Sequence, residues 1–198
     1  MPAAPGQFGQ PSTPRGEATL RRILDAATEE FAVRGIAGAR MERITSAART
    51  NKAQVYAYFG SKEGLFDAVM ADRVDHAVSA VTFDVDDLPG FAVAQYDENL
   101  RQPNLVRLIT WTRLERHPTG HWFDTPRHEP KLAAIAGAQA DGKIRPGDPG
   151  DLLIMIMGMA GSWSPASSVY TASSSEPKTV HERRRQILRE SVARLIAP

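Results

Sequence analysis

Apolar residues recur at the spacing of an α-helix along almost the whole chain of 198 residues. Leu20, Leu24, Ala27 and Phe31, for example, fall at i, i+4, i+7 and i+11, which is one stripe of an amphipathic helix. Almost no stretch alternates apolar and polar residues with period 2, the pattern of a half-buried strand. Because 42% of the residues are hydrophobic, the chain can bury a core. The sequence therefore predicts an all-α protein.

Glycine, proline and capping residues divide this pattern into elements. Gly35 and Gly60 are placed to end helices, and Asn51 and Ser61 are placed to start them as N-caps. The segment FDVDDLPG (83–90) reads as a domain junction or an interhelical loop, and the Ser-rich segment 164–177 as a mobile connection. The expected helices cover residues 17–34, 40–48, 52–59, 61–80, 90–101, 103–117, 127–140, 148–161 and 178–196. The helix at 148–161 is apolar nearly all round, so we expect it to be buried on more than one side, and the last helix places Arg184 near its polar side.

Two of these helices are short and only three residues apart, which is a helix-turn-helix pattern. In this arrangement the first helix braces the second, so that the second can enter a DNA major groove, which is wide enough for one helix. At about 100° per residue, Val55 and Phe59 share a face, and we expect them to anchor the second helix on Phe31 and Ile44.

The opposite face of the second helix carries the candidate DNA contacts. Ala53 and Ala57 are small enough to let the backbone approach base edges, and the Gln54 side chain can hydrogen-bond adenine. Longer side chains at the ends and sides of this face are expected to position the helix on phosphates. The expected DNA-contact residues are Arg40, Thr45, Arg49, Asn51, Lys52, Ala53, Gln54, Tyr56, Tyr58 and Lys62.

The charge of the chain is uneven, although the formal net charge is only +1. Residues 1–62 carry nine Lys or Arg against five Asp or Glu, whereas the remaining residues carry fifteen against eighteen. This asymmetry favours an N-terminal module that faces a polyanion. We expect a disordered tail over residues 1–14, a helix-turn-helix DNA-binding domain over 15–62 and a larger C-terminal helical domain over 63–198.

Three segments, RRILDAATEEFAVRG, MERITSAA and VYAYFGSKEGLFDAV, resemble the N-terminal DNA-binding domain of TetR/AcrR-family transcriptional repressors. The resemblance covers roughly residues 21–69. In that family the residues that match Tyr56, Tyr58 and Lys62 contact DNA phosphates, and those that match Lys52 and Ala53 meet bases.

The resemblance also implies how the whole chain works. It implies a regulator without enzymatic activity or cofactor, a homodimer on a near-palindromic double-stranded operator, released by a small-molecule effector that binds in the C-terminal domain. The helices at 148–161 and 178–196 would then form the dimer interface. A constitutive DNA-binding dimer without an effector stays open as an alternative, and so does activation in place of repression.

The turn departs from the family pattern. The family usually has Ala-Gly-Val-Ser, where this chain has Ala48, Arg49, Thr50 and Asn51. A left-handed backbone at Arg49 would cost about 1 kcal/mol or more, and a phosphate contact would offset that cost. Arg40 stands where the family usually has a threonine. The operator sequence therefore does not transfer from relatives.

Aromatic residues after the helix-turn-helix are candidates for an effector pocket, because such pockets are mostly apolar and aromatic. Core or dimer packing explains each of them equally well. The candidates are Phe91, Tyr96, Trp111, Trp122, Phe123 and Trp163.

A metal-binding helical enzyme that uses His117, His121 and His128 is the remaining alternative, since imidazole suits Zn²⁺. Prolines and a glycine interrupt that stretch, so no single helix presents the three rings together, and we expect no metal site.

Composition indicates the compartment. The chain has no cysteine, which fits a reducing environment, and its N-terminus lacks the apolar run of a secretory signal. The longest apolar stretch, LLIMIMGMAGSW, has about 12 residues against the ~20 that cross a bilayer. We expect a cytoplasmic protein with no membrane partner.

Overall fold

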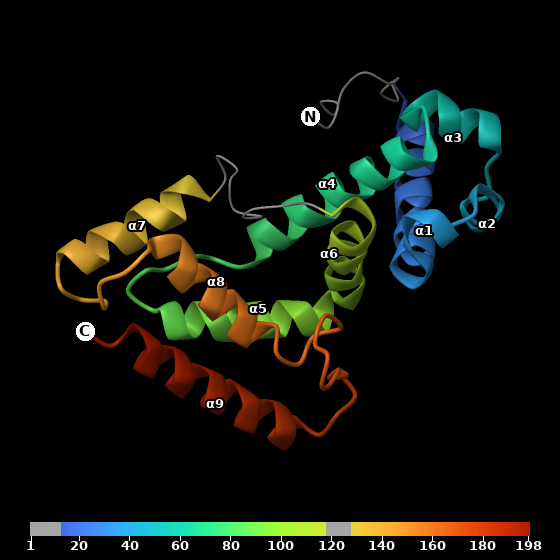
Figure 1. Ribbon diagram of the computed structural model, residues 1–198. Coiled ribbons are helices and arrows are strands. Elements are labelled where there is room, and N and C mark those ends of the chain that lie inside the picture. Colours follow the sequence, from blue (N-terminus) through green and yellow to red (C-terminus); the bar gives the residue numbers. More distant parts are fainter. Residues whose placement is uncertain (1–12, 118–127) are drawn as a thin grey trace. The chain divides into compact units, whose positions relative to one another are not determined.

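The structure, a computed structural model, describes residues 13–117 and 128–198. Within these ranges every regular element is an α-helix, which confirms the all-α prediction (Figure 1). In chain order the helices are α1 (Pro14–Gly38), α2 (Met41–Ala47), α3 (Lys52–Phe59), α4 (Lys62–Ala80), α5 (Leu88–Arg101), α6 (Pro103–Arg116), α7 (Glu129–Ala140), α8 (Pro149–Ala160) and α9 (Lys178–Ile196).

Local signals place the ends of the helices around the recognition motif. Asn51 Oδ1 accepts the amide of Gln54 at 2.9 Å, and Ser61 Oγ accepts the amide of Gly64 at 2.9 Å, so both predicted N-caps are confirmed. Gly60, with φ 73°, ends α3, and Gly35, with φ 69°, interrupts α1 before its last turn. Glycine adopts such left-handed angles without steric cost, which explains why the chain turns at these positions.

The described chain packs as two compact units. The N-terminal unit contains the described residues up to His76 together with Asn104–His117, and the C-terminal unit contains Ala77–Pro103 and residues 128–198. The N-terminal unit thus includes most of α4 and also α6, which the expected boundary after residue 62 places with the C-terminal domain. Most of the expected tail, residues 1–12, lies outside the described residues, and Thr13 caps α1 by accepting the amide of Gly16.

The core of the N-terminal unit holds the recognition motif in place. Val55 and Phe59 of α3 belong to one buried cluster with Phe31 and Ile44, which confirms the predicted anchor. Phe31 meets Phe66 of α4 edge to face, with ring centroids 5.2 Å apart. Full burial of such side chains contributes about 1.5–3 kcal/mol each, so α3 is fixed by packing although it is too short to be stable alone.

The C-terminal unit packs α5 against α8 and α9, and α7 against α8. Figure 1 shows α5 and α9 lying side by side. Leu153 and Ile156 of α8 are buried, but Ile154 and Met155 are 39% and 50% exposed. The expectation that this nearly all-apolar helix is buried on more than one side is therefore not met within one chain.

Two expectations for this unit are wrong. Arg184, expected near the polar side of the last helix, is buried and donates to Glu176 at 2.8 and 3.1 Å. Glu176 also accepts the Tyr170 hydroxyl at 2.6 Å and the Ser173 amide at 3.1 Å. The Ser-rich connection is thus fastened to α9, because one carboxylate satisfies several donors at once.

Membrane insertion finds no support in the described helices, because none of them combines the length and the apolar character that a membrane span requires.

Candidate nucleic-acid interface

α3 separates its side chains by face, as its sequence predicts. Val55 and Phe59 are buried, whereas Ala53, Tyr56 and Ala57 are exposed. The exposed face is therefore lined by two methyl groups with one aromatic ring beside them. Such a surface lets a helix approach base edges closely while a phenol lies at its side.

The turn before α3 contains a strained arginine. Arg49 has φ 51°, so its backbone adopts the left-handed conformation that the sequence analysis considered for this position. The amide of Thr50 donates to the carbonyl of Thr45 at 3.0 Å, the bond by which a left-handed residue closes a helix end. Glycine is the usual residue in that conformation, so the arginine costs about 1 kcal/mol or more.

The guanidinium groups of Arg40 and Arg49 are available for an external partner. Both residues are exposed, and neither side chain donates a hydrogen bond or joins an ion pair within the described residues. In contrast, Arg43 pairs with Glu30 at 2.9 Å. Arg40 and Arg49 flank α2, so two guanidinium groups without an ion pair among the described residues stand at the two ends of that helix.

Lys52 already has a partner in the folded chain. Its ammonium forms an exposed ion pair with Glu42 of α2. The hydrogen bond from Lys52 lowers the pKa of Glu42, and the same bond raises the pKa of Lys52. A DNA phosphate would have to compete with this carboxylate or share the ammonium with it.

Lys62 is half-buried and also engaged. Its ammonium donates to the carbonyls of Ala37 and Ala39 at 3.3 and 3.4 Å. An ammonium has three donors, so one remains for another acceptor. Lys62 thus ties the start of α4 to the chain that enters α2.

Three further predicted contact residues have structural partners. Thr45 is buried, and its hydroxyl donates to the carbonyl of Glu42 at 3.1 Å. The Thr50 hydroxyl donates to Gln54 Oε1 at 2.6 Å, and the Asn51 side chain caps α3. Thr45 consequently faces inward, whereas Gln54 keeps its amide nitrogen for an outside acceptor. Tyr58 is half-buried and stacks edge-on against Phe59.

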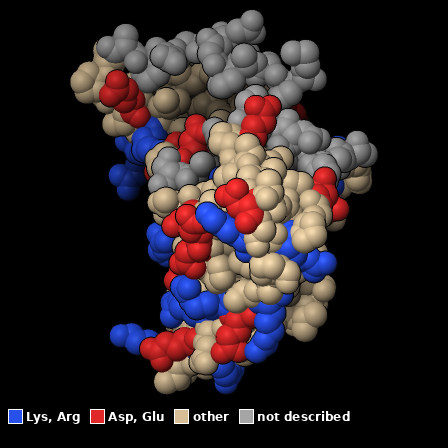
Figure 2. Space-filling view, turned by 90° about the vertical axis from the view of Figure 1, so that its left-hand side faces the viewer, with Lys and Arg blue, Asp and Glu red and all other residues tan. Residues whose placement is uncertain are grey.

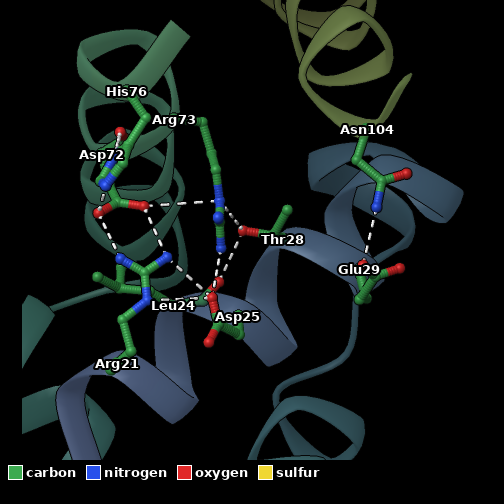
Figure 3. A network of polar contacts seen from close by, with 9 residues as sticks. All are labelled: Arg21, Leu24, Asp25, Thr28, Glu29, Asp72, Arg73, His76 and Asn104. Atoms are coloured by element: carbon green, nitrogen blue, oxygen red, sulfur yellow. Dashed lines mark hydrogen bonds and ion pairs between the residues drawn. The ribbon is translucent and has the colours of Figure 1, made fainter. Parts of the chain in front are cut away.

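A polar network fastens α4 to α1 (Figure 3). Arg21 pairs with Asp72 at 2.8 Å and with Asp25 at 2.9 Å, and Arg73 pairs with Asp25 at 2.5 Å. Arg73 also donates to the Thr28 hydroxyl at 3.0 Å. Partial burial raises the pKa of Asp25, but the hydrogen bonds from both arginines outweigh it and hold that pKa below its ordinary value. These contacts hold α4, at Asp72 and Arg73, against α1, the helix that supports the recognition motif.

Charges of both signs are mixed on the face drawn in Figure 2, and neither sign gathers there into one patch. That face offers no continuous basic surface to a polyanion.

The six aromatic pocket candidates do not come together. Tyr96 and Trp163 meet edge to face, with centroids 5.7 Å apart. Together with Asn99 and Ser164 they line a recess that is too narrow to hold a water molecule. Phe91 packs against Phe83 in the core. Trp111 belongs to the N-terminal unit. Trp122 and Phe123 lie outside the described residues.

The histidine alternative gains no support from geometry. No three His, Cys, Asp or Glu side chains in the described ranges could hold one metal ion. His117 is exposed, His128 is buried, and His121 lies outside the described residues.

Glu115 of α6 makes contacts beside the recognition motif that sequence reasoning missed. Its carboxylate oxygens accept the amides of Ile36 and Ala37 at 2.9 and 2.8 Å. Gly35, which frees those amides, was the only signal in the sequence, and it does not say which side chain binds them.

Comparison with known proteins agrees with this geometry. A family model described as "Bacterial regulatory proteins, tetR family" matches residues 23–69, and one described as "Tetracyclin repressor-like, C-terminal domain" matches residues 87–194. The HTH-type transcriptional repressor SCO4008 of Streptomyces coelicolor is 38% identical over 152 residues, 75% of this chain and 79% of the relative. The HTH-type transcriptional regulator RutR of Escherichia coli K12 is 31% identical over 151 residues, 70% of each chain.

Solved structures show the same fold. The crystal structure of SCO4942 from Streptomyces coelicolor has a TM-score of 0.75 and 36% identity, and covers 90% of this chain and 98% of its own. The structure of AibR in complex with isovaleryl coenzyme A and operator DNA has a TM-score of 0.59 at 22% identity, with 91% and 99% covered. At that identity the second similarity supports the fold alone.

Proposed function

The chain belongs to the TetR family of bacterial regulatory proteins, and from this premise we propose that it is a homodimeric transcriptional repressor that binds a near-palindromic operator through α3 and is released by a small molecule. The observation that carries the proposal is the division of α3 into a buried face, with Val55 and Phe59, and an exposed face, with Ala53 and Ala57. A helix that is anchored by its buried face and carries small side chains on its exposed face can enter a major groove.

Phosphate contacts would hold this helix in register. We assign them to Tyr56, Tyr58 and Lys62 on one side and to Arg40 and Arg49 on the other. The two arginines have no intramolecular partner among the described residues, so they lose no existing bond when they meet DNA. We assign the base contacts to the first residues of α3, which are Lys52, Ala53 and Gln54, and to its N-cap, Asn51.

A dimer would arise from α8 and α9. Ile154 and Met155 of α8 and Ile187 of α9 are large apolar side chains that one chain leaves exposed. Gly158 lies on the same side of α8 as Met155, and a Cβ added there would meet nothing within 4 Å. An exposed apolar face with a small residue suits close packing against a symmetry-related copy, which buries the same surface on both subunits.

An effector would enter at the recess beside Tyr96 and Trp163. The recess has no room even for a water molecule, so a ligand has to open it. The effector would then bind the open arrangement of the recess more tightly than the closed one. A ligand can shift the balance between two arrangements only if its affinities for them differ. AibR, a structural neighbour, was solved with isovaleryl coenzyme A and operator DNA.

The narrow recess also favours a second candidate function, a DNA-binding dimer that no small molecule controls. Thermal-shift screening of metabolites, followed by release assays on the operator, separates the two candidates. A compound that stabilises the protein and lowers its operator affinity supports the effector-controlled repressor. If no compound does so while the operator is bound, the constitutive dimer is supported.

DNA binding itself is tested with an operator selected from a random library. The double variant Tyr56→Phe, Lys62→Ala should bind this operator more weakly, and the slope of its salt dependence should fall by about one for each phosphate that the protein no longer neutralises. Arg113→Ala, at an exposed position of α6, is the matched control and should bind like the original protein. Unchanged affinity and salt dependence in the double variant would contradict the assignment.

A further inference from the structure

α6 is fastened along α1 by three polar ties. Asn104 donates to Glu29 Oε1 at 2.8 Å, as Figure 3 shows. The Trp111 indole N–H donates to the carbonyl of Ala32 at 3.2 Å, and Glu115 accepts the two amides just beyond Gly35. The ties follow the same order along both helices. α6 is therefore attached to the helix that supports the recognition motif.

The Glu115 tie depends on the break at Gly35. Because Gly35 leaves the helical conformation, the amides of Ile36 and Ala37 lose their helical acceptors, and the carboxylate takes both of them, as a capping group does. A Cβ at Gly35 would lie 2.1 Å from Glu115 Oε1 and 2.8 Å from the Trp111 ring. Only glycine lets α6 come this close.

The carbonyl side of the same short segment is bound by Lys62. The ammonium donates to Ala37 and Ala39, while the carboxylate accepts from Ile36 and Ala37. Residues 36–39 thus lie between a carboxylate on their N–H side and an ammonium on their C=O side, the arrangement that peptide dipoles favour. The segment leads directly into Arg40 and α2.

We propose that Glu115 is a positioning residue for the DNA interface. By holding residues 36–39 it sets the place of Arg40 at the start of α2 and of the Lys62 ammonium, so that a shift of α6 reaches the interface directly. This inference rests on the proposed DNA-binding function. It adds a contact from α6 to the contact that α4 makes with α1 through the ion pairs of Arg21 and Arg73.

The test compares operator affinity with folding stability. Glu115→Gln keeps the size of the side chain but replaces one acceptor oxygen with a donor that faces a backbone amide, and operator affinity should fall roughly tenfold. Leu105→Ala removes a buried α6 side chain that is not part of the core cluster around Val55 and Phe59, and it is the destabilised control. It should lower the melting temperature and leave operator affinity unchanged at a temperature where both variants are folded.

Two further variants make the result specific. Trp111→Phe keeps an aromatic ring but removes the indole N–H that donates to Ala32. It should weaken operator binding by a smaller factor even if Glu115→Gln fails to fold. In a Lys62→Ala background Glu115→Gln should cost less than it does alone, because both act on residues 36–39.

The outcomes separate the two proposals. If Glu115→Gln and Trp111→Phe bind the operator as tightly as Leu105→Ala does, the role of Glu115 is overturned while DNA binding stands. If the unmodified protein selects no DNA sequence, the proposed function fails, and the role of Glu115 fails with it.

Discussion

Arg184 holds Glu176 through both of its terminal nitrogens, at 2.8 and 3.1 Å, from inside the C-terminal unit. The guanidinium also lies over the ring of Tyr170 at 5.0 Å. Two bonds of fixed geometry and one ring contact therefore join α9 to the connection that precedes it.

This pair makes the C-terminal unit sensitive to acid. The hydrogen bonds from Arg184 and then from Tyr170 lower the pKa of Glu176 from 4.5 to about 2. Because the folded pKa is the lower one, the stabilisation is complete above the unfolded value and is lost as the pH falls from 4.5 toward about 2. Glu176→Gln should unfold at lower urea concentration than the original protein at pH 6, and this difference should vanish near the bottom of that range. Glu182→Gln, an exposed carboxylate on α9, is the control and should show no such pH-dependent difference.

Gly35→Ala should be among the most destabilising glycine substitutions in the N-terminal unit. Gly35 has φ 69° and ψ −175°, a region that is essentially restricted to glycine and costs other residues about 1–3 kcal/mol. The clash with Glu115 and Trp111 adds to that cost. Urea unfolding of the variant measures the loss. Gly137→Ala is the matched control: Gly137 is exposed in α7 with free space around it, so alanine should stabilise the protein by roughly 0.5–1 kcal/mol. Equal stability of the two variants would refute the close approach at Gly35.

Arg49→Gly should raise stability and lower DNA affinity. Glycine relieves the left-handed strain, which is worth about 1 kcal/mol, but it removes a charge without an intramolecular partner among the described residues. Unfolding experiments and operator titrations at several salt concentrations measure the two effects. Arg49→Lys retains the charge and the strain and should keep most of the affinity. A stabilised Arg49→Gly protein that binds DNA with an unchanged salt dependence would show that Arg49 does not contact phosphate.

Gly158→Leu should separate the proposed dimer into monomers without unfolding the chain. A Cβ at this exposed position of α8 has open space around it, but the longer side chain would hold a partner helix away from Met155 and Ile154. Sedimentation equilibrium over a range of concentrations measures the change. Gly137→Leu introduces the same side chain on α7 and should leave the oligomeric state alone. Dimers of equal strength in both variants would place the interface elsewhere.

The recognition motif was predictable because its signals are local. Asn51 caps α3 from three residues away, and Gly60 stops it through its own φ, so the predicted range 52–59 equals the observed helix. The strain at Arg49 followed from a single substitution in a known turn. Each of these features depends on neighbouring residues, whose spacing a sequence displays.

The contacts that hold α6 and α9 could not be predicted, because their partners are not recognisable from local spacing in the sequence. Glu115 and Ile36 are 79 positions apart, and nothing in their spacing marks them as partners. Arg184 looked like a surface residue until the structure supplied Glu176 as its partner. Trp111 was likewise predicted to line a pocket, because the sequence identifies an aromatic side chain but not the helix that it contacts.

The place of α6 has a consequence for the engineering of chimeric regulators. A fragment that ends at His76 contains α1, α2 and α3, yet it lacks the carboxylate that binds the amides of Ile36 and Ala37 and the indole that binds Ala32. Grafting this fragment onto another regulator would leave Gly35 facing a side chain that did not evolve beside it. The exchangeable part of this protein is therefore discontinuous in sequence, and a functional graft has to carry α6 along with the motif that it supports.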